Sequence, residues 1–232
     1  MNTILVCDDE RDIVSAIRIY LNGEGYRVLE AYSGVQALEL MARERVDLVL
    51  MDIMMPEMDG LTAVAKIRET SNVPVLFLSA KSEDTDKILG LTIGADDYIT
   101  KPFNPVELCA RVRSHLRRYI QLGGAAAQNG AVMRVGGIEL NDESKAVTLA
   151  GEPVSLTPLE YSILRLLMET PGKVFSSDEI YQAVWNDAPY GANATVAVHI
   201  RHLREKLEID PANPRYLKVL WGHGYKMEAD NG

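Results

Sequence analysis

Short apolar runs alternate with amphipathic stretches through the first half of the chain. The apolar runs span residues 3–7, 26–31, 48–51, 73–78 and 97–100, and stretches with helical spacing lie near residues 11–23, 34–44, 60–69, 84–93 and 105–118. Short apolar runs bounded by turn signals are typical of buried parallel strands. Strand–helix repeats in this order predict a doubly wound α/β domain with right-handed crossovers over residues 1–118.

Hydrophobic periodicity is lost over residues 119–131, where small and polar residues dominate. This composition is typical of a flexible linker between two domains. Beyond it, short alternating runs separated by glycine and asparagine predict small antiparallel hairpins up to residue 156. Three amphipathic stretches and a final hairpin follow, so the order of elements predicts a winged helix within an α+β domain over residues 132–228.

The last of these amphipathic stretches, near residues 193–207, has two distinct faces. Val196, Ile200, Leu203 and Leu207 recur at helical spacing and form one apolar stripe. The opposite face carries mostly small and basic side chains: Ala194, Thr195, Val198, Arg201, His202 and Glu205, with Arg204 at its edge. A helix with a buried back and a basic front fits the major groove of DNA, although an ordinary solvated surface helix has a similar pattern.

Length and composition agree with two soluble globular domains. The chain has 232 residues, of which 47% are hydrophobic and 25% charged, and these values are ordinary for such domains. No apolar run approaches the roughly 20 residues of a membrane helix, and the N-terminus lacks the basic start of a signal peptide. Cys7 and Cys109 have no metal-binding spacing and are typical of reduced thiols. We therefore expect a cytoplasmic protein without membrane contact.

The net charge of −9 gives no sign that the chain as a whole binds nucleic acid. Near the C-terminus the balance is different, because residues 194–226 carry six basic residues against three acidic ones. This local excess of basic residues favours nucleic acid as a partner of the second domain.

Polar residues follow four of the predicted strands of the first domain. Asp8-Asp9-Glu10 comes after the first strand, Asp52 after the third, Ser79 after the fourth and Lys101 after the fifth. Because the carboxyl ends of parallel strands meet at one edge of a sheet, we expect these side chains to converge. Asp52 taken alone could be a metal ligand, a nucleophile or a residue that serves the fold.

The chemistry of the whole group favours a phosphoryl site. Neighbouring carboxylates repel one another unless a cation lies among them, and a hard divalent cation such as Mg²⁺ suits oxygen ligands. The lysine and the serine hydroxyl suit a phosphoryl group, and one carboxylate could be the nucleophile that forms an aspartyl phosphate. Any one of these residues alone is more often a helix cap, a turn residue or a surface charge.

These motifs resemble the signature of a response-regulator receiver domain over residues 1–118. The matching segments are Asp8-Asp9, Asp52 with Met55-Pro56 and Asp59-Gly60, Ser79-Ala80, and Lys101-Pro102-Phe103. The resemblance implies a flavodoxin-like (βα)5 fold in which Asp52 accepts a phosphoryl group from a sensor histidine kinase. It also implies that Mg²⁺ is held by Asp8, Asp9, Asp52 and the backbone carbonyl of Met54. Lys101, whose bond to Pro102 is often cis in the family, would pair with the phosphoryl oxygens, and Ser79 and Tyr98 would form the switch pair.

The resemblance to one response-regulator subfamily implies a homodimer that forms on phosphorylation. The expected pairs between subunits are Lys87 with Glu107, Asp97 with Arg111, and Asp96 with Arg118, around an apolar patch of Ile88, Leu91 and Ala110. An ordinary solvated face with mixed charges is the alternative.

The second half resembles the winged-helix effector domain of the OmpR/PhoB family. The resemblance rests on Thr157-Pro158-Leu159-Glu160-Tyr161, on the run from Val196 to Arg204, and on Gly222-His223-Gly224-Tyr225-Lys226. It implies binding to double-stranded DNA at direct repeats, with RNA polymerase as a further candidate partner. We expect contacts to DNA from Arg201, His202 and Arg204, and contacts to phosphates from Thr195, Lys218 and Lys226.

Two positions depart from the pattern of this family. Many members have arginine where Ala194 and Trp221 stand, so a phosphate or minor-groove contact is missing or replaced here. Trp221 and the run over residues 199–206 resemble the VanR-like branch, whose regulated genes concern the response to glycopeptides.

Two other hypotheses of function stay open from the residues alone. The first is a Mg²⁺-dependent phosphohydrolase with Asp52 as nucleophile. Hydrolases of the haloacid-dehalogenase type usually carry a second aspartate two residues after the nucleophile, where this chain has Met54. The second is a regulator that ignores phosphorylation and binds constitutively, whose usual mark, the loss of an acidic or lysine position, is not found.

Overall fold

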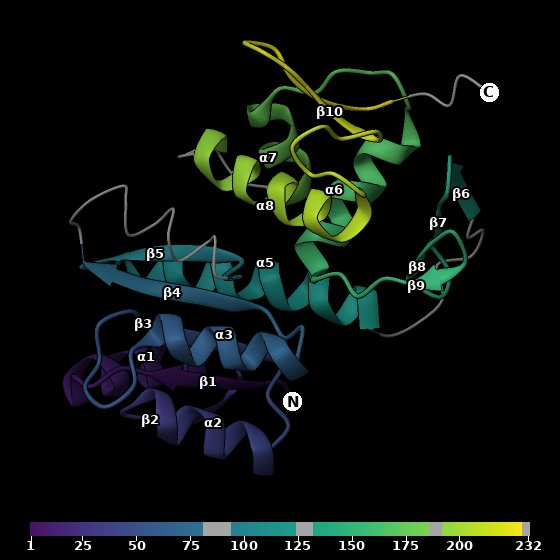
Figure 1. The fold of residues 1–232 in the computed structure, drawn as a ribbon. Coiled ribbons are helices and arrows are strands. Elements are labelled where there is room, and N and C mark those ends of the chain that lie inside the picture. Colours follow the sequence, from purple (N-terminus) through teal and green to yellow (C-terminus); the bar gives the residue numbers. More distant parts are fainter. Residues whose placement is uncertain (81–93, 124–131, 186–191, 229–232) are drawn as a thin grey trace. The chain divides into compact units, whose positions relative to one another are not determined.

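The computed structural model describes residues 1–80, 94–123, 132–185 and 192–228 (Figure 1). The chain divides into two compact units, Met1–Tyr119 and Ile120–Gly232. Separate clusters of buried apolar side chains form the cores of the two units. Among the described residues, no helix combines the length and the hydropathy that crossing a bilayer requires.

A five-stranded parallel sheet forms the centre of the first unit. Its strands are β1 (Thr3–Cys7), β2 (Arg27–Ala31), β3 (Leu48–Asp52), β4 (Val75–Ala80) and β5 (Asp97–Lys101). They lie in the order β2-β1-β3-β4-β5, which is the flavodoxin-like order with its reversal between β1 and β3. The predicted fold class is confirmed, and the predicted helix near residues 84–93 lies outside the described residues.

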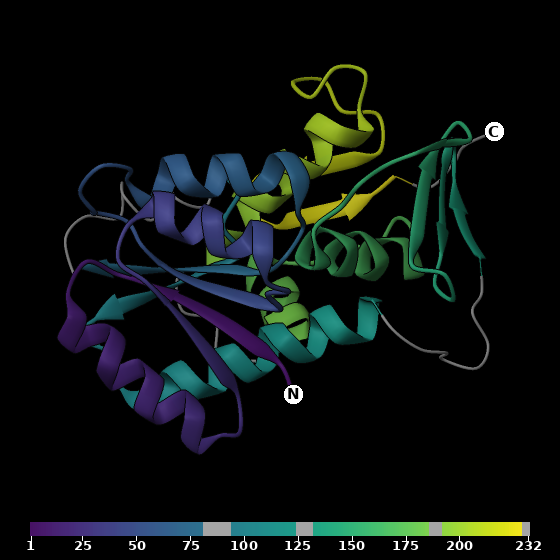
Figure 2. The ribbon, with the colours of Figure 1, turned by 90° about the horizontal axis from the view of Figure 1, so that it is seen from below.

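Helices cover both faces of this sheet (Figure 2). The helices α1 (Arg11–Gly23) and α5 (Pro105–Gly123) pack on one face, and α2 (Gly34–Arg43) and α3 (Gly60–Thr70) pack on the other. Alternate residues of β1 and β3 therefore enter two different cores. Ile4 and Val6 join the cluster under α1 and α5, whereas Leu5 and Cys7 join the cluster under α2 and α3. This explains why the strands are continuous apolar runs.

The helix α5 is longer than predicted. The loss of apolar periodicity placed its end at residue 118, but the helix continues to Gly123. Tyr119, the first residue of the predicted linker, still packs against the apolar core of the first unit, and this contact favours continued helix. Residues 124–131 of the predicted linker lie outside the described residues, and the domain boundaries stay a prediction.

The second unit begins with a four-stranded antiparallel sheet of β6 (Val132–Val135), β7 (Ile138–Asn141), β8 (Ala146–Leu149) and β9 (Glu152–Pro153). Three helices follow, α6 (Pro158–Glu169), α7 (Ser177–Trp185) and α8 (Ala192–Leu207), and then the hairpin of β10 (Leu217–Leu220) and β11 (Gly224–Met227). The capping box predicted at Thr157 and Glu160 is present in both directions. This is the winged helix that the order of elements predicts.

Gly60 allows the loop after β3 to turn back against the strand. Its N–H donates a hydrogen bond to the carbonyl of Ile53, at 2.9 Å. A Cβ atom at this position would lie 2.0 Å from the carbonyl oxygen of Asp52, so only glycine fits without movement of the backbone. The position of the loop next to Asp52 therefore depends on this residue.

We expect Gly60→Ala to lower the free energy of unfolding by about 1–3 kcal/mol or more, because the added methyl group forces this loop away from β3. Urea denaturation followed by circular dichroism measures the change. Gly23→Ala is the matched control, since a Cβ there meets nothing within 4 Å and should be neutral or slightly stabilising. Equal stability of the two variants would contradict the role given to Gly60.

Candidate functional site

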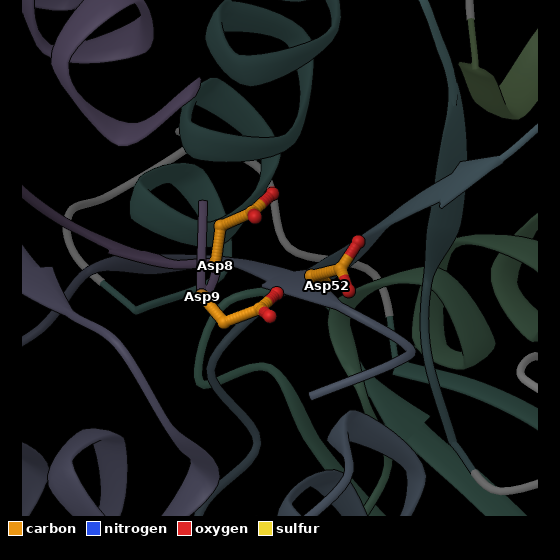
Figure 3. A group of neighbouring side chains, drawn as sticks. All are labelled: Asp8, Asp9 and Asp52. Carbon is orange, nitrogen blue, oxygen red and sulfur yellow. The ribbon is translucent and has the colours of Figure 1, made fainter. Parts of the chain in front are cut away.

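Three carboxylates converge at the carboxyl edge of the parallel sheet (Figure 3). Asp8 and Asp9 follow β1 and Asp52 ends β3, the neighbouring strand. One oxygen from each carboxylate lies within 4.8 Å of the others, and Asp8 and Asp52 are buried while Asp9 is exposed. Carboxylate oxygens are the donors that hard divalent cations prefer, so this group could hold a metal ion.

Lys101, at the end of β5, reaches into the same cluster. Its Nζ atom lies 2.6 Å from Oδ2 of Asp8 and 2.7 Å from Oδ1 of Asp52. The predicted convergence of these three strand ends is thus present in the structure. The peptide bond between Lys101 and Pro102 is cis, as the family resemblance implied.

The carboxylate of Asp52 is fixed through both of its oxygens. Oδ1 faces Lys101, and Oδ2 accepts a hydrogen bond of 2.9 Å from the backbone N–H of Met54. Burial raises the pKa of the Asp52 carboxyl, and the hydrogen bond to Lys101 only partly offsets this rise. Burial would lower the pKa of Lys101, but its bonds to Asp52 and Asp8 outweigh burial and raise the pKa. The result is a charged lysine beside an unusually basic carboxylate.

Ser79 lies at the same edge, near the end of β4. Asp52 pairs in register with Leu78, the residue before Ser79, and Ser79 itself pairs with Thr100 of β5. Its side chain is buried. Tyr98, on β5, is half-buried and packs against the core under α2 and α3. The hydroxyl and the ring therefore lie on adjacent strands.

Cys7 directly precedes Asp8 but does not belong to the cluster of Asp8, Asp9, Asp52 and Lys101. Burial first, and then the charge of Asp8, raise the pKa of its thiol to about 12. The thiol contacts the carbonyl of Ser33 at 3.3 Å. Cys7 and Cys109 are both free, which agrees with the prediction of reduced thiols.

A compact and largely buried charge network links β5 and α5. Oδ2 of Asp97 lies 2.9 Å from Nη1 of Arg111 and 3.1 Å from Nε2 of His115. Arg111 also contacts Glu107 at 3.0 Å, and Arg118 approaches the other ring nitrogen of His115 at 3.5 Å. His115 was not predicted as a member of this network, although its position four residues after Arg111 puts both on one helical face.

The other residues of the predicted dimer face have different environments. Asp96 is buried, and its Oδ2 accepts hydrogen bonds from Arg68 and from the backbone N–H of Val75, each at 2.8 Å. Ala110 is exposed on α5. Lys87, Ile88 and Leu91 lie outside the described residues. The pairing of all these residues between subunits stays a prediction.

The predicted DNA-contact residues of α8 also differ in environment. Arg201 is exposed and pairs with Glu205 at 2.9 Å. Thr195 is buried. The side chain of His202 is only 11% exposed, with Nδ1 at 3.9 Å from Oε1 of Glu160. Arg204 donates to the carbonyl of Leu217 from both Nε and Nη2, at 3.0 and 2.7 Å. Arg201 is thus the member of this set with the freest access to a ligand.

The hairpin of β10 and β11 is attached to the end of α8. The buried carboxylate of Glu208 accepts backbone hydrogen bonds of 2.6–2.8 Å from Arg215, Tyr216 and Leu217. Arg204, one helical turn earlier, holds the carbonyl of Leu217. Lys218 and Lys226 face each other on the two strands of the hairpin. The role of Glu208 was not predicted, since an acidic residue after a helix gives no signal of its own.

Two family models match the chain, and each match lies within one of the two units. The response regulator receiver domain matches residues 4–113, and the C-terminal domain of transcriptional regulatory proteins matches residues 151–227. The regulatory protein VanR of Enterococcus faecium is 45% identical over 97% of this chain and 98% of its own length. The chain is an OmpR/PhoB-type response regulator, similar to VanR.

Further comparisons agree with this family. The transcriptional regulatory protein YcbL of Bacillus subtilis is 41% identical to the response regulator over 96% of this chain and 99% of its own. The crystal structure of DrrB, a Thermotoga maritima OmpR/PhoB homolog, is 31% identical, with a TM-score of 0.52 over 99% of this chain and 100% of its own. The family consists of transcription regulators, so the phosphohydrolase hypothesis is not favoured.

The response regulator should lose part of its stability in acid through Asp97. Burial alone would raise the pKa of this carboxyl, but the hydrogen bond to His115 and the charge of Arg111 lower it from 3.8 to about 2. Because the folded pKa lies below the unfolded one, the ionised carboxylate stabilises the fold above about pH 4. That stabilisation is lost as the pH falls through about 2.

We expect Asp97→Asn to lower the free energy of unfolding by about 2 kcal/mol at pH 7, and the difference from the wild type to shrink toward pH 2. Urea denaturation at a series of pH values measures it. Glu69→Gln, on the exposed face of α3, should change stability little at any pH. A difference for Asp97→Asn that does not depend on pH would refute the assignment.

Proposed function

We propose that phosphorylation of Asp52 by a sensor histidine kinase switches this response regulator into a DNA-binding dimer. The observation that carries the proposal is the position of the Asp52 carboxylate, held between the Lys101 ammonium and the Met54 N–H beside two further aspartates. Transfer of a phosphoryl group needs a nucleophile and fixed positive charge near the phosphoryl oxygens. At this edge of the sheet Asp52 would be the nucleophile and Lys101 would supply the charge.

The transfer moves one phosphoryl group without net oxidation or reduction. An oxygen of the Asp52 carboxylate attacks the phosphorus atom of the kinase phosphohistidine. The new P–O bond forms as the P–N bond breaks, and the imidazole leaves with its electron pair. Lys101 is already within 2.7 Å of Asp52 and can pair with the phosphoryl oxygens as they arrive.

Mg²⁺ is the metal that we propose for this site, because carboxylate and carbonyl oxygens are donors that suit a hard divalent cation. We propose Asp9, Asp52 and the carbonyl of Met54 as its ligands, with Asp8 binding directly or through water. When bound, the ion neutralises charge on the phosphoryl group in transit. Asp8 and Asp52 share a single lysine, so the cluster with Asp9 keeps an excess of negative charge that a divalent cation would offset.

The signal would pass from the sheet edge to the face of β5 and α5. The Ser79 hydroxyl is proposed to donate a hydrogen bond to the phosphoryl group, while the Tyr98 ring turns further inward. Tyr98 follows Asp97 in the chain, and its N–H donates to the Asp97 carboxylate at 2.9 Å. Rotation of the Tyr98 ring would therefore disturb the network of Asp97 and Arg111, and with it the contacts between subunits that are proposed for these residues.

Dimerisation would couple phosphorylation to DNA binding. Joining two receivers raises the local concentration of two effector domains, which favours binding at direct repeats in double-stranded DNA. We propose Arg201 as the main contact to base edges, with Lys218 and Lys226 near phosphates. RNA polymerase is a further proposed partner, and the cytoplasm, where kinase and DNA are both accessible, is the proposed location.

Incubation with acetyl phosphate and Mg²⁺ tests the acceptor. We expect about one labelled phosphoryl group per chain, none in Asp52→Asn, and a shift from monomer to dimer in sedimentation that the variant lacks. Asp59→Asn is the control, because the Asp59 side chain caps α3 through the N–H of Thr62 and asparagine is an equally good cap. Continuous release of phosphate without a stable labelled chain would instead support the hydrolase hypothesis.

Arg201→Ala tests the proposed binding to DNA. Loss of a base-edge contact should weaken binding to DNA selected from genomic fragments by about 1–3 kcal/mol and relax specificity at one position. Arg134→Ala is the matched control, since Arg134 is also an exposed arginine paired with a glutamate, but on β6. Equal binding by Arg201→Ala and the wild type would remove Arg201 from the interface.

A further inference from the structure

The carboxylate of Glu160 lies buried between the start of α6 and the flank of α8, and its side chain is only 3% exposed. Its Oε2 atom accepts a hydrogen bond of 2.8 Å from the backbone N–H of Thr157, as part of the capping box of α6. The same oxygen lies 2.6 Å from Nζ of Lys206, in the last turn of α8. Nδ1 of His202, one helical turn before Lys206, lies 3.9 Å from Oε1. One carboxylate therefore serves two helices.

The cap of α6 does not require the negative charge of Glu160. A capping box forms with glutamate or glutamine at this position, because either side chain offers an oxygen to the N–H of the capping residue. A neutral amide, however, cannot form an ion pair with Lys206. The pairing with α8 is therefore a separate property of Glu160, and Glu160→Gln removes it while the cap is kept.

Burial distinguishes this ion pair from two others near the proposed DNA contacts. Arg201 and Lys226 also pair with glutamates, but these carboxylates are 46% and 37% exposed. Exposed pairs are worth little, so their cations can exchange the glutamate for a DNA phosphate. A buried carboxylate that loses its cation keeps an uncompensated charge away from water, which is strongly unfavourable. Glu160 therefore retains Lys206 where Arg201 and Lys226 can turn to DNA.

Without this partner, Lys206 would be available to DNA. Its side chain is 34% exposed, and it lies on α8 four residues after His202, on the same helical face. An ammonium on the proposed recognition helix attracts the backbone of any duplex, because phosphates are the same in every sequence. A contact of this kind positions a protein on DNA but carries no sequence information.

We propose that Glu160 is a specificity-determining residue, which withholds Lys206 from DNA phosphates and so limits nonspecific binding. The inference rests on the proposed DNA-binding function and deepens it. In nonspecific binding the domain can shift along the duplex until an ammonium meets a phosphate, whereas base contacts hold α8 in one register in selective binding. Retention of Lys206 therefore weakens nonspecific binding more than selective binding.

The salt dependence of binding to a random-sequence duplex tests the inference. Each phosphate contact made by a cation adds about one to the slope of log affinity against log salt concentration. We expect Glu160→Gln to bind this duplex about two- to fivefold more tightly than the wild type at low salt, with a slope steeper by about one. Its preference for DNA selected from genomic fragments over the random duplex should fall by about the same factor.

Glu139→Gln is the matched control. It makes the same change in net charge and also releases an arginine, Arg134, but on the hairpin of β6 and β7. Its slope and its preference should equal those of the wild type. The double variant Glu160→Gln, Lys206→Met removes the released ammonium without leaving a buried charge, and its slope should return to the wild-type value.

Thermal melting followed by circular dichroism checks that each variant is folded. A folded Glu160→Gln variant with the slope and the preference of the wild type would mean that Glu160 serves only the fold, and would overturn the inference while the proposed function stands. A double variant with a shallower slope than the wild type would show that Lys206 already contacts phosphate, and would overturn it even if Glu160→Gln alone does not fold. A wild type that binds no sequence selectively would contradict the proposed function and the inference with it.

Discussion

The Lys101 ammonium lies between two buried carboxylates, and the edge of the parallel sheet is organised by this contact. Asp8 and Asp52 stand on neighbouring strands and would repel each other in a site with little water. Lys101 approaches them from β5, with β4 between its own strand and β3. One side chain therefore offsets the repulsion and connects strands that are not paired with each other.

The contact of Lys101 with Asp52 also links the proposed phosphorylation site to the proposed dimer face on β5 and α5. A phosphoryl group on Asp52 would compete with the Asp8 carboxylate for the Lys101 ammonium. Any movement of Lys101 would act on β5, the strand that carries Tyr98 and the buried Asp97. The charge network of Asp97, Arg111 and His115 begins only four residues before Lys101 along the strand. The proposed acceptor site and the proposed dimer face thus lie at the two ends of β5.

The sequence was sufficient for the fold class and for the members of the acidic cluster. Parallel strands end at a common edge, so the positions of Asp8, Asp52 and Lys101 along the chain are enough to predict their convergence. Side-chain partners across larger separations were not predictable in this way. A helical wheel puts Arg204 at the edge of a basic face, but only the packed structure shows that the guanidinium turns to the Leu217 carbonyl. His115 and Glu208 were missed for the same reason, and the end of α5 was misplaced because Tyr119 finds its partners in the core rather than along the helix.

The attachment of the hairpin to α8 separates the residues that the fold requires from the residues that can vary. Glu208 and Arg204 bind backbone atoms of residues 215–217, so they tolerate many different side chains further along the hairpin. The tip at Trp221 contributes nothing to the buried core. Substitutions there can therefore accumulate at little cost to folding. The exposed turn of this hairpin can change in sequence while the attachment of its base to α8 stays the same.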